Sequence, residues 1–219
     1  MSDLAIDVLL RPDEDGRRAA ASLNARLRTE AAHGFAFDAT HEPHITVLQR
    51  CVAAADLDRV LAVAARAAET ADLGATSLHA TGLVWAPFDT PPPAVLVSID
   101  LAPEPALQRL HRTVLAALDP LPAVRPEPAA FFSLPGETGV GPDAIDYVAR
   151  FVPEHAGEHY EPHLSIGVAD EPVAARLQAS FTPFRFGIEA LAVYRIGEFG
   201  TARRRLASRP LGARRLGAA

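Results

Sequence analysis

The sequence contains no lysine, a single cysteine, and no apolar run of the roughly 20 residues that a membrane-spanning helix needs. The lone Cys51 cannot form a disulfide within the chain, so no covalent crosslink holds the fold. The first residues, Met-Ser-Asp-Leu-Ala-Ile-Asp, also lack the basic stretch followed by an apolar one that marks a signal peptide. These absences predict a cytoplasmic protein, with a structural rather than a nucleophilic thiol at Cys51.

Because lysine is absent, all 21 basic residues are arginine, and they are distributed unevenly. The last 19 residues hold six arginines and no acid, so with an overall formal charge of −6 the preceding 200 residues carry a net −12. Such an acidic body argues against sequence-independent binding of duplex nucleic acid, which depends on neutralising phosphates. The arginine-rich end fits either a contact with a phosphate or RNA end, or a solvated tail. Its arginines are Arg203, Arg204, Arg205, Arg209, Arg214 and Arg215.

Hydrophobic residues make up 49% of the chain, which is enough for a substantial core and argues against disorder. Apolar periodicity and turn residues predict a β-α-β-α-β order that occurs twice, without the glycine signature of a dinucleotide-binding unit. The expected strands are 4–10, 43–49, 76–86, 94–101, 162–168, 184–196 and 201–208, with a proline-rich turn at 91–93. The expected helices are 13–33, 55–71, 104–118 and 172–181.

The repeated order indicates one bilobal domain over 1–219, with a first repeat at about 1–90 and a second at about 91–210. The second repeat is longer because of an insertion at about 121–159, rich in proline and glycine, in which 143–151 is expected to form a short helix. Insertions of this length are usually either functional covers or disordered segments, and both interpretations stay open. We therefore predict an α+β fold of two mostly antiparallel sheets that face a central cleft, with helices outside.

Two short segments, 42–47 and 161–166, have nearly the same sequence: Glu-Pro-His, then an apolar residue, a hydroxyl residue and another apolar residue. Successive side chains of a strand point to opposite faces, so the histidine and the hydroxyl two residues later share one face. The apolar residues then point the other way, into a core. Two such strands facing one cleft would surround a small volume with two imidazoles and two hydroxyls, from His44, Thr46, His163 and Ser165.

The bare spacing of histidine and hydroxyl is not specific, because His79 and His111 also have threonine two residues later. His111 lies in a stretch with helical periodicity, where residues two apart do not face each other. His79 is flanked by small residues instead of large apolar anchors. Only the matched context around His44 and His163 therefore indicates a joint site.

With these motifs and the repeat around them, the chain resembles the 2H phosphoesterase superfamily, which includes 2′-5′ RNA ligase-like proteins and cyclic nucleotide phosphodiesterases. The resemblance implies a duplicated, LigT-like fold and chemistry without a metal or other cofactor. It implies a 2′,3′-cyclic phosphate or a related phosphodiester of a nucleotide or RNA end as the substrate, and a 2′-phosphomonoester as the usual product of hydrolysis. No membrane and no obligate protein partner is implied, and we expect a monomer.

The residue chemistry agrees with this activity, since opening a cyclic phosphodiester needs one base for water and one acid for the departing 3′ oxygen. Histidine has an ordinary pKa of about 6.5, so small shifts leave one imidazole neutral and one charged near neutral pH. We assign His163 as the base and His44 as the acid. Thr46 and Ser165 are expected to donate hydrogen bonds to the nonbridging oxygens.

Three further residues are candidate substrate contacts. Tyr160 stands beside the second motif and could stack on a base, while Arg50 and Arg195 could contact phosphate.

Other functions stay open at this stage. The same groups could run the reverse reaction and act as a 2′-5′ RNA ligase, or the site could bind a nucleotide or RNA end without turnover. A metal site is a third alternative, because His155, His159 and His163 are spaced four residues apart. However, Pro162 disfavours a helix that reaches His163.

Overall fold

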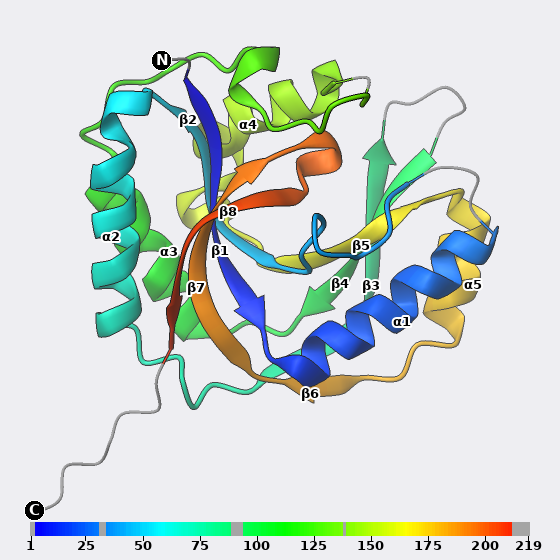
Figure 1. The fold of residues 1–219 in the computed structure, drawn as a ribbon. Helices are drawn as coiled ribbons and strands as arrows, with labels where there is room; N and C mark the ends of the chain where they lie inside the picture. The colour runs from blue at the N-terminus through cyan, green and yellow to red at the C-terminus, as the bar shows by residue number, and fades with distance from the viewer. Residues whose placement is uncertain (1–2, 31–33, 89–93, 138, 212–219) are drawn as a thin grey trace, which may run out of the picture.

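The computed structural model describes residues 3–30, 34–88, 94–137 and 139–211, whose strands form two four-stranded sheets (Figure 1). The first sheet has the order β2-β1-β7-β8 and the second the order β5-β4-β3-β6, with every neighbouring pair antiparallel. The strands are β1 (Leu4–Pro12), β2 (Ile45–Val52), β3 (Leu78–Phe88), β4 (Ala94–Leu101), β5 (His163–Ala169), β6 (Phe184–Phe186), β7 (Ile188–Ile196) and β8 (Ala202–Pro210). The predicted α+β class with two antiparallel sheets is confirmed.

Five α-helices and four short 3₁₀ turns connect these strands within the described residues. The helices are α1 (Glu14–Glu30), α2 (Leu57–Thr70), α3 (Pro105–Leu118), α4 (Pro142–His155) and α5 (Glu171–Ala179). The 3₁₀ turns are η1 (Ala54–Asp56), η2 (Pro128–Ala130), η3 (Gly157–His159) and η4 (Glu198–Gly200). None of the helices in this part of the chain is both long and apolar enough to cross a bilayer.

Most predicted elements occur within a few residues of their expected bounds, and the differences are local. The last part of the expected helix 13–33, the turn at 91–93, and Arg214 and Arg215 lie outside the described residues. The expected single strand 184–196 is wrong. It is broken at Gly187, where the backbone N–H donates to Asp13 Oδ2 at 2.7 Å and the chain crosses from the second sheet to the first.

The sheets do not coincide with the two halves of the sequence, because each sheet takes strands from both. β3 precedes the second half but pairs with β4, and β7 and β8 follow the second motif but complete the first sheet. The helices cross over as well: α1 follows β1 yet packs on β5, and α3 follows β4 yet packs on β2. Each motif strand is therefore covered by a helix from the other half.

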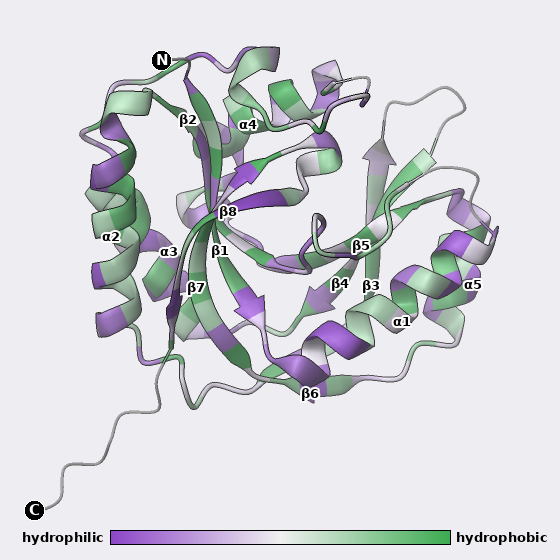
Figure 2. Ribbon diagram, in the orientation of Figure 1, coloured by the Kyte–Doolittle hydropathy of each residue, from purple (hydrophilic) through white to green (hydrophobic). Residues whose placement is uncertain are grey.

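Apolar residues follow the strands of both sheets, whereas the outer helices alternate between apolar and polar stretches (Figure 2). Figure 1 places α2 beside the first sheet and α1 and α5 beside the second. Helix α1 approaches β5 closely at Gly167, where a Cβ would lie 3.3 Å from Asn24 Nδ2. Gly167 has φ +142°, a conformation that favours glycine, so both the backbone and the packing there depend on the missing side chain.

The two motif strands share a backbone irregularity at the same position. In β2 the register shifts so that Val8 pairs with Leu48 and Leu9 with Thr46, which leaves Val47 as the extra residue of a β-bulge. In β5 the corresponding shift leaves Ile166 extra, immediately after Ser165. β-bulges increase the local twist and change the direction of neighbouring side chains. The sequence repeat therefore extends to the backbone beside both histidines.

The insertion at about 121–159 is ordered over its described residues and packs against the first sheet. It contains η2, α4 and η3, and α4 lies against β2. Phe131 and Val148 are buried with Ala5, Cys51 and Ile196 of the sheet. The disordered alternative is therefore excluded for these residues, and the predicted helix at 143–151 is confirmed as part of α4.

Candidate active site

His44 and His163 line one cavity of about 320 Å³ whose walls come from both sheets, from α4 and from the loop before β2. Thr46 and Ser165 line the same cavity. The structure thus brings together all four side chains of the paired motifs. Strand alternation accounts for this, because each histidine and its hydroxyl stand two residues apart on the side of the strand that faces the cavity.

The Glu-Pro-His part of each motif fixes the imidazole. His44 Nδ1 lies 2.8 Å from the carbonyl oxygen of Glu42, and His163 Nδ1 lies 2.9 Å from that of Glu161. A carbonyl oxygen can only accept, so both Nδ1 atoms carry a hydrogen and donate it. Because Nδ1 is engaged, Nε2 is the ring nitrogen that can exchange a proton in the cavity, and in His44 this atom lies beside a carboxylate.

A buried carboxylate that the sequence analysis did not select stands beside the first motif. Asp7 of β1 is fully buried, and its Oδ2 accepts hydrogen bonds of 2.8 Å from Thr46 Oγ1 and from Gln49 Nε2. The same oxygen lies 3.4 Å from His44 Nε2. The hydroxyl hydrogen of Thr46 is therefore directed to Asp7, which differs from its expected role as a donor to phosphate. The signal in the sequence was a single acid inside an otherwise apolar strand.

The second motif has an apolar residue at the position that corresponds to Asp7. Asp7 pairs with Gln49 across from the first motif, and the equivalent pair across from the second is Leu96 and Val168. Leu96 also lines the cavity. Ser165 Oγ lies 3.1 Å from Ser98 Oγ, and no acid accepts its hydrogen bond among the described contacts. The two halves thus match in backbone and differ in charge.

This difference separates the two imidazoles electrostatically. Burial opposes the charged form of His44, but the hydrogen bond and charge of Asp7, together with Glu42, outweigh it and raise the pKa of His44. Burial also opposes the charged form of His163, and the nearby His44 adds to this effect, so the pKa of His163 is lowered. The pKa values of the two imidazoles are therefore moved in opposite directions, so His44 holds a proton more readily than His163.

Tyr160 holds the first motif strand and does not line the cavity of the two histidines. Its hydroxyl donates to the carbonyl oxygen of Thr46 at 2.7 Å, and its ring stacks on His111 with centroids 4.0 Å apart. His111 in turn donates from Nδ1 to the carbonyl of Val47, at the bulge, over 2.7 Å. Tyr160 lines a neighbouring cavity of about 380 Å³, which shares Thr46 and His163 with the first.

Arg50 and Arg195 anchor the insertion and lie away from the cavity, which corrects their expected role as phosphate contacts. Arg50 donates to the carbonyl oxygens of Leu118 at 2.6 Å and Leu121 at 3.2 Å. Arg195 donates to those of Ala130 and Phe131 at 2.9 and 2.8 Å. A guanidinium carries several donors in one plane, so it can satisfy loop carbonyls that no strand or helix pairs.

Aromatic side chains form a further wall of the cavity, which we call the aromatic wall and define as Phe35, Phe37 and Phe199. The ring of Phe35 lies 5.6 Å from that of Phe37 and 6.1 Å from that of Phe199. It also stacks on His41 at 5.6 Å with an interplanar angle of 11°. Phe199 has φ +59°, an uncommon backbone conformation for an aromatic residue and one that is often kept for function.

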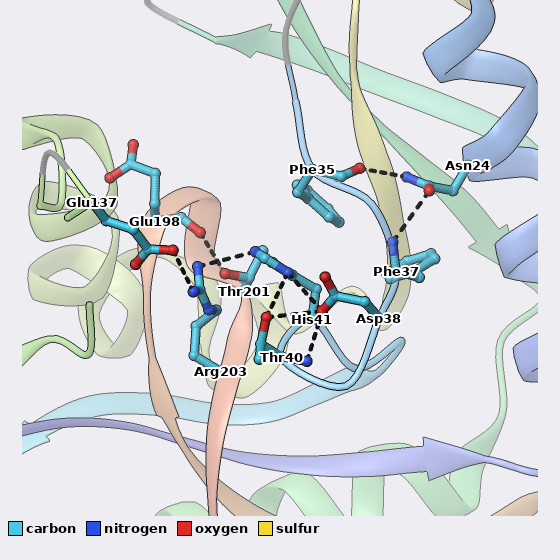
Figure 3. Close-up of polar contacts among 10 residues, drawn as sticks. All are labelled: Asn24, Phe35, Phe37, Asp38, Thr40, His41, Glu137, Glu198, Thr201 and Arg203. Atoms are coloured by element: carbon cyan, nitrogen blue, oxygen red, sulfur yellow. Dashed lines mark hydrogen bonds and ion pairs between the residues drawn. The ribbon is translucent and has the colours of Figure 1, made fainter. Parts of the chain in front are cut away.

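A polar network fixes the loop that carries Phe35 and Phe37 (Figure 3). Arg203 is buried and donates to Glu137 Oε1 at 2.6 Å and to His41 Nε2 at 3.0 Å. Because arginine only donates, His41 must accept at Nε2, which leaves Nδ1 to donate to Asp38 at 3.1 Å. Arg203 of the C-terminal arginine cluster is therefore a structural group that joins the insertion to the cavity wall.

The three histidines considered as a metal site do not share one helix. α4 ends at His155, and Gly157 has φ +67°, which turns the chain before His159. His155 stacks on Tyr147 with centroids 4.9 Å apart. Within the described ranges, no group of three or more histidine, cysteine or acidic side chains is arranged to hold a metal ion.

Two antiparallel sheets that each present a His-x-Thr or His-x-Ser strand to one cavity are the arrangement of the 2H, LigT-like fold. The sequence model of the 2′-5′ RNA ligase superfamily matches residues 12–198, so the chain belongs to that superfamily and the resemblance drawn from the motifs is confirmed. No curated protein matches the chain at a significant level.

One solved structure shows a similar fold at low sequence identity, and two others match with lower TM-scores. TT0787 of Thermus thermophilus is 18% identical with a TM-score of 0.56, and the match covers 95% of this chain and 98% of that one. Usb1 of Kluyveromyces marxianus is 16% identical with a TM-score of 0.42, over 95% and 98% of the two chains. Its structure with uridine monophosphate gives 16% and 0.41, over 96% and 98%.

Asn24 of α1 links the aromatic wall to the second motif strand, and its replacement tests that link. Its Nδ2 donates to the carbonyl oxygens of Phe35 at 2.9 Å and Ile166 at 2.8 Å. Asn24→Leu leaves these buried groups unpaired, so we expect the free energy of unfolding to fall by about 2–4 kcal/mol in urea denaturation. Ser22→Leu, on an exposed position of the same helix, should change it by less than about 0.5 kcal/mol. Equal values for the two variants would contradict the structural role of Asn24.

Proposed function

We propose that this protein is a metal-independent phosphodiesterase that opens 2′,3′-cyclic phosphates of nucleotides or RNA ends, with His44 as general acid and His163 as general base. The observation that carries the proposal is the pair of imidazoles on one cavity, each anchored through Nδ1, with pKa values moved in opposite directions. Pairs of titratable groups separated in this way are typical of acid–base catalysis.

In the proposed reaction, His163 Nε2 takes a proton from a water molecule whose oxygen attacks the phosphorus atom. The bond from phosphorus to the 3′ oxygen breaks, and His44 Nε2 donates its proton to that oxygen. The product is a 2′-phosphomonoester with a free 3′-hydroxyl. Ser165, whose hydroxyl is not directed to an acid among the described contacts, supplies a hydrogen bond to a nonbridging oxygen, where negative charge develops.

The aromatic wall supports a nucleotide as the substrate. Aromatic rings stack on bases of any sequence, with a contribution of about 1–3 kcal/mol per base. Phe35 and Phe199 line the same cavity as the histidines. A nucleotide whose phosphate lies at the histidines can therefore place its own base on this wall. We therefore place the base at the aromatic wall, instead of at Tyr160.

Replacement of either histidine tests the catalytic assignment. We expect His44→Ala and His163→Ala each to lower the rate of conversion of 2′,3′-cyclic nucleotides by about 10²–10⁴-fold in EDTA, because each removes one proton transfer. Phosphorus NMR measures the conversion and identifies the 2′-monophosphate. His79→Ala is the matched control, because His79 has the same spacing to Thr81 on β3 but does not line the cavity. Activity that survives both substitutions, or that EDTA abolishes, would refute the mechanism.

The pH profile follows from the direction of the two shifts. Activity should rise with pH as His163 loses its proton, with a midpoint below about 6.5, because its pKa is lowered. It should fall again as His44 loses its proton, with a midpoint above about 6.5, because its pKa is raised. The measurement is kcat/KM between pH 4.5 and 9.5, taken as roughly the range in which both groups titrate.

The pH profile alone does not say which histidine is the acid, whereas the leaving group does. A nucleoside 2′-(p-nitrophenyl) phosphate releases p-nitrophenolate, which needs no proton at neutral pH. His44→Ala should therefore keep most of the wild-type rate on this ester, and His163→Ala should not. The opposite pattern would exchange the two roles.

The aromatic wall has its own test. Phe35→Leu removes the stacking surface and keeps an apolar side chain, so KM for 2′,3′-cyclic nucleotides should rise by about 5- to 100-fold with little change in kcat. Phe184→Leu, which lies on β6 and does not line the cavity, is the control. An unchanged KM in Phe35→Leu would place the base elsewhere.

A further inference from the structure

The two halves of the site have the same backbone and nearly the same motif, so a difference between them has to come from the residues around the motifs. The strand pairings place Asp7 and Leu96 at corresponding positions, each across from the residue three after the motif hydroxyl. Leu96 lines the cavity, and Asp7 binds Thr46, which also lines it. One of the two positions therefore holds a carboxylate and the other an apolar side chain. A core strand needs no charge at this position, as Leu96 demonstrates.

Asp7 is an unfavourable residue to keep in this place. It is fully buried on β1, a strand with a neighbour on each side, and burial of an unpaired carboxylate is strongly destabilising. Two donors satisfy its Oδ2, and within the described residues the charged group beside it is the imidazole of His44. Its Oδ1 is buried and has no hydrogen-bond partner among those residues. The polar neighbours of Oδ2 are thus two neutral donors and the His44 imidazole.

We propose that Asp7 is the positioning residue that keeps His44 protonated and directs its Nε2. In this proposal, Thr46 and Gln49 donate their hydrogen bonds to Asp7 and not to the substrate. This inference rests on the proposed function, and it names the reason why His44 is the acid and His163 the base. Asp7 touches neither the phosphate nor the water, and it acts through His44. After His44 has given its proton to the leaving oxygen, the carboxylate favours uptake of the next proton from solvent at the same Nε2.

The arrangement also divides the two motif hydroxyls between different tasks. Thr46 Oγ1 has one hydrogen, and that hydrogen goes to Asp7 Oδ2. Either hydroxyl can donate in the contact between Ser165 Oγ and Ser98 Oγ, and when Ser98 donates, the hydrogen of Ser165 is left for a phosphate oxygen. The substitutions Thr46→Val and Ser165→Ala should therefore affect different steps, although their positions in the motifs are the same.

Several other titratable or charged groups line the cavity with His44, and they are the alternatives against which Asp7 is tested. They come from the loop before β2, from α4 and from β5, and all line the cavity: His41, Glu42, Asp143, Asp146, Tyr147, Arg150 and His163.

The first experiment is an NMR titration of the His44 ring in the wild type and in Asp7→Asn, which keeps the shape and the acceptor oxygen. We expect the midpoint of His44 to fall by about one pH unit or more, because an opposite charge is removed. The alkaline limb of kcat/KM should move to lower pH by the same amount, and the acid limb should stay. Asp100→Asn on β4 is the matched control: its carboxylate accepts from Thr81 and does not line the cavity, so the His44 midpoint should not move.

The second experiment uses the leaving group and does not depend on Asp7→Asn being folded. If Thr46 acts through Asp7 and the acid, Thr46→Val should slow the cyclic nucleotide and largely spare the p-nitrophenyl ester. Ser165→Ala should slow both substrates, and Thr46→Ser should restore the wild-type pattern.

The outcomes separate this inference from the proposed function. Turnover by the wild type with an unmoved His44 midpoint in Asp7→Asn, or an equal loss on both substrates in Thr46→Val, would overturn the role of Asp7 and leave the two-histidine mechanism standing. A wild type that turns over neither substrate would overturn the proposed function. The titration would then still report whether Asp7 sets the charge of His44.

Discussion

The antiparallel pairing of β1 with β2, and of β4 with β5, is the constraint on which the site depends. In each pair a central strand fixes the register of a motif strand, and the same bulge follows the motif hydroxyl. A shift of one residue would turn every histidine and hydroxyl from the cavity into the core. The bulge is therefore part of the site, because it follows the motif hydroxyl directly in both strands and changes the direction of the side chains beside it.

The cavity belongs to neither sheet alone, and the packing around it joins the two halves repeatedly. α1 and α3 each cover the motif strand of the other half, and Asn24 bonds both to β5 and to the loop before β2. Arg50 and Arg195 attach the insertion to the first sheet through backbone carbonyls. The loss of one of these contacts is thus expected to change the position of His44 relative to His163.

Much of this organisation could be predicted from the sequence, and the misses have physical causes. Periodicity predicts whether a segment is a helix or a strand, but not which element it packs against. The sequence therefore could not predict that β3 pairs with β4, that β7 pairs with β1, or that α1 packs on β5. Apolar residues continue across Gly187, which hid the break between β6 and β7. Arg50 and Arg195 were misassigned because a guanidinium serves a loop carbonyl as well as a phosphate. Asp7 was visible only as one acid in an apolar strand.

The two motifs of the duplicated scaffold are nearly the same, yet the proposed reaction needs one histidine to give a proton while the other takes one. With equivalent surroundings, the single proton of a half-protonated pair would be shared equally between the two imidazoles, so neither would be fixed as the acid or the base. One substitution in one half is enough to separate them, provided that it is buried where water does not weaken its field. Asp7, at the position that corresponds to Leu96 in the other half, has that placement. In the proposed mechanism, the phosphate meets an imidazolium at His44, and the buried Asp7 is the group that favours its protonation.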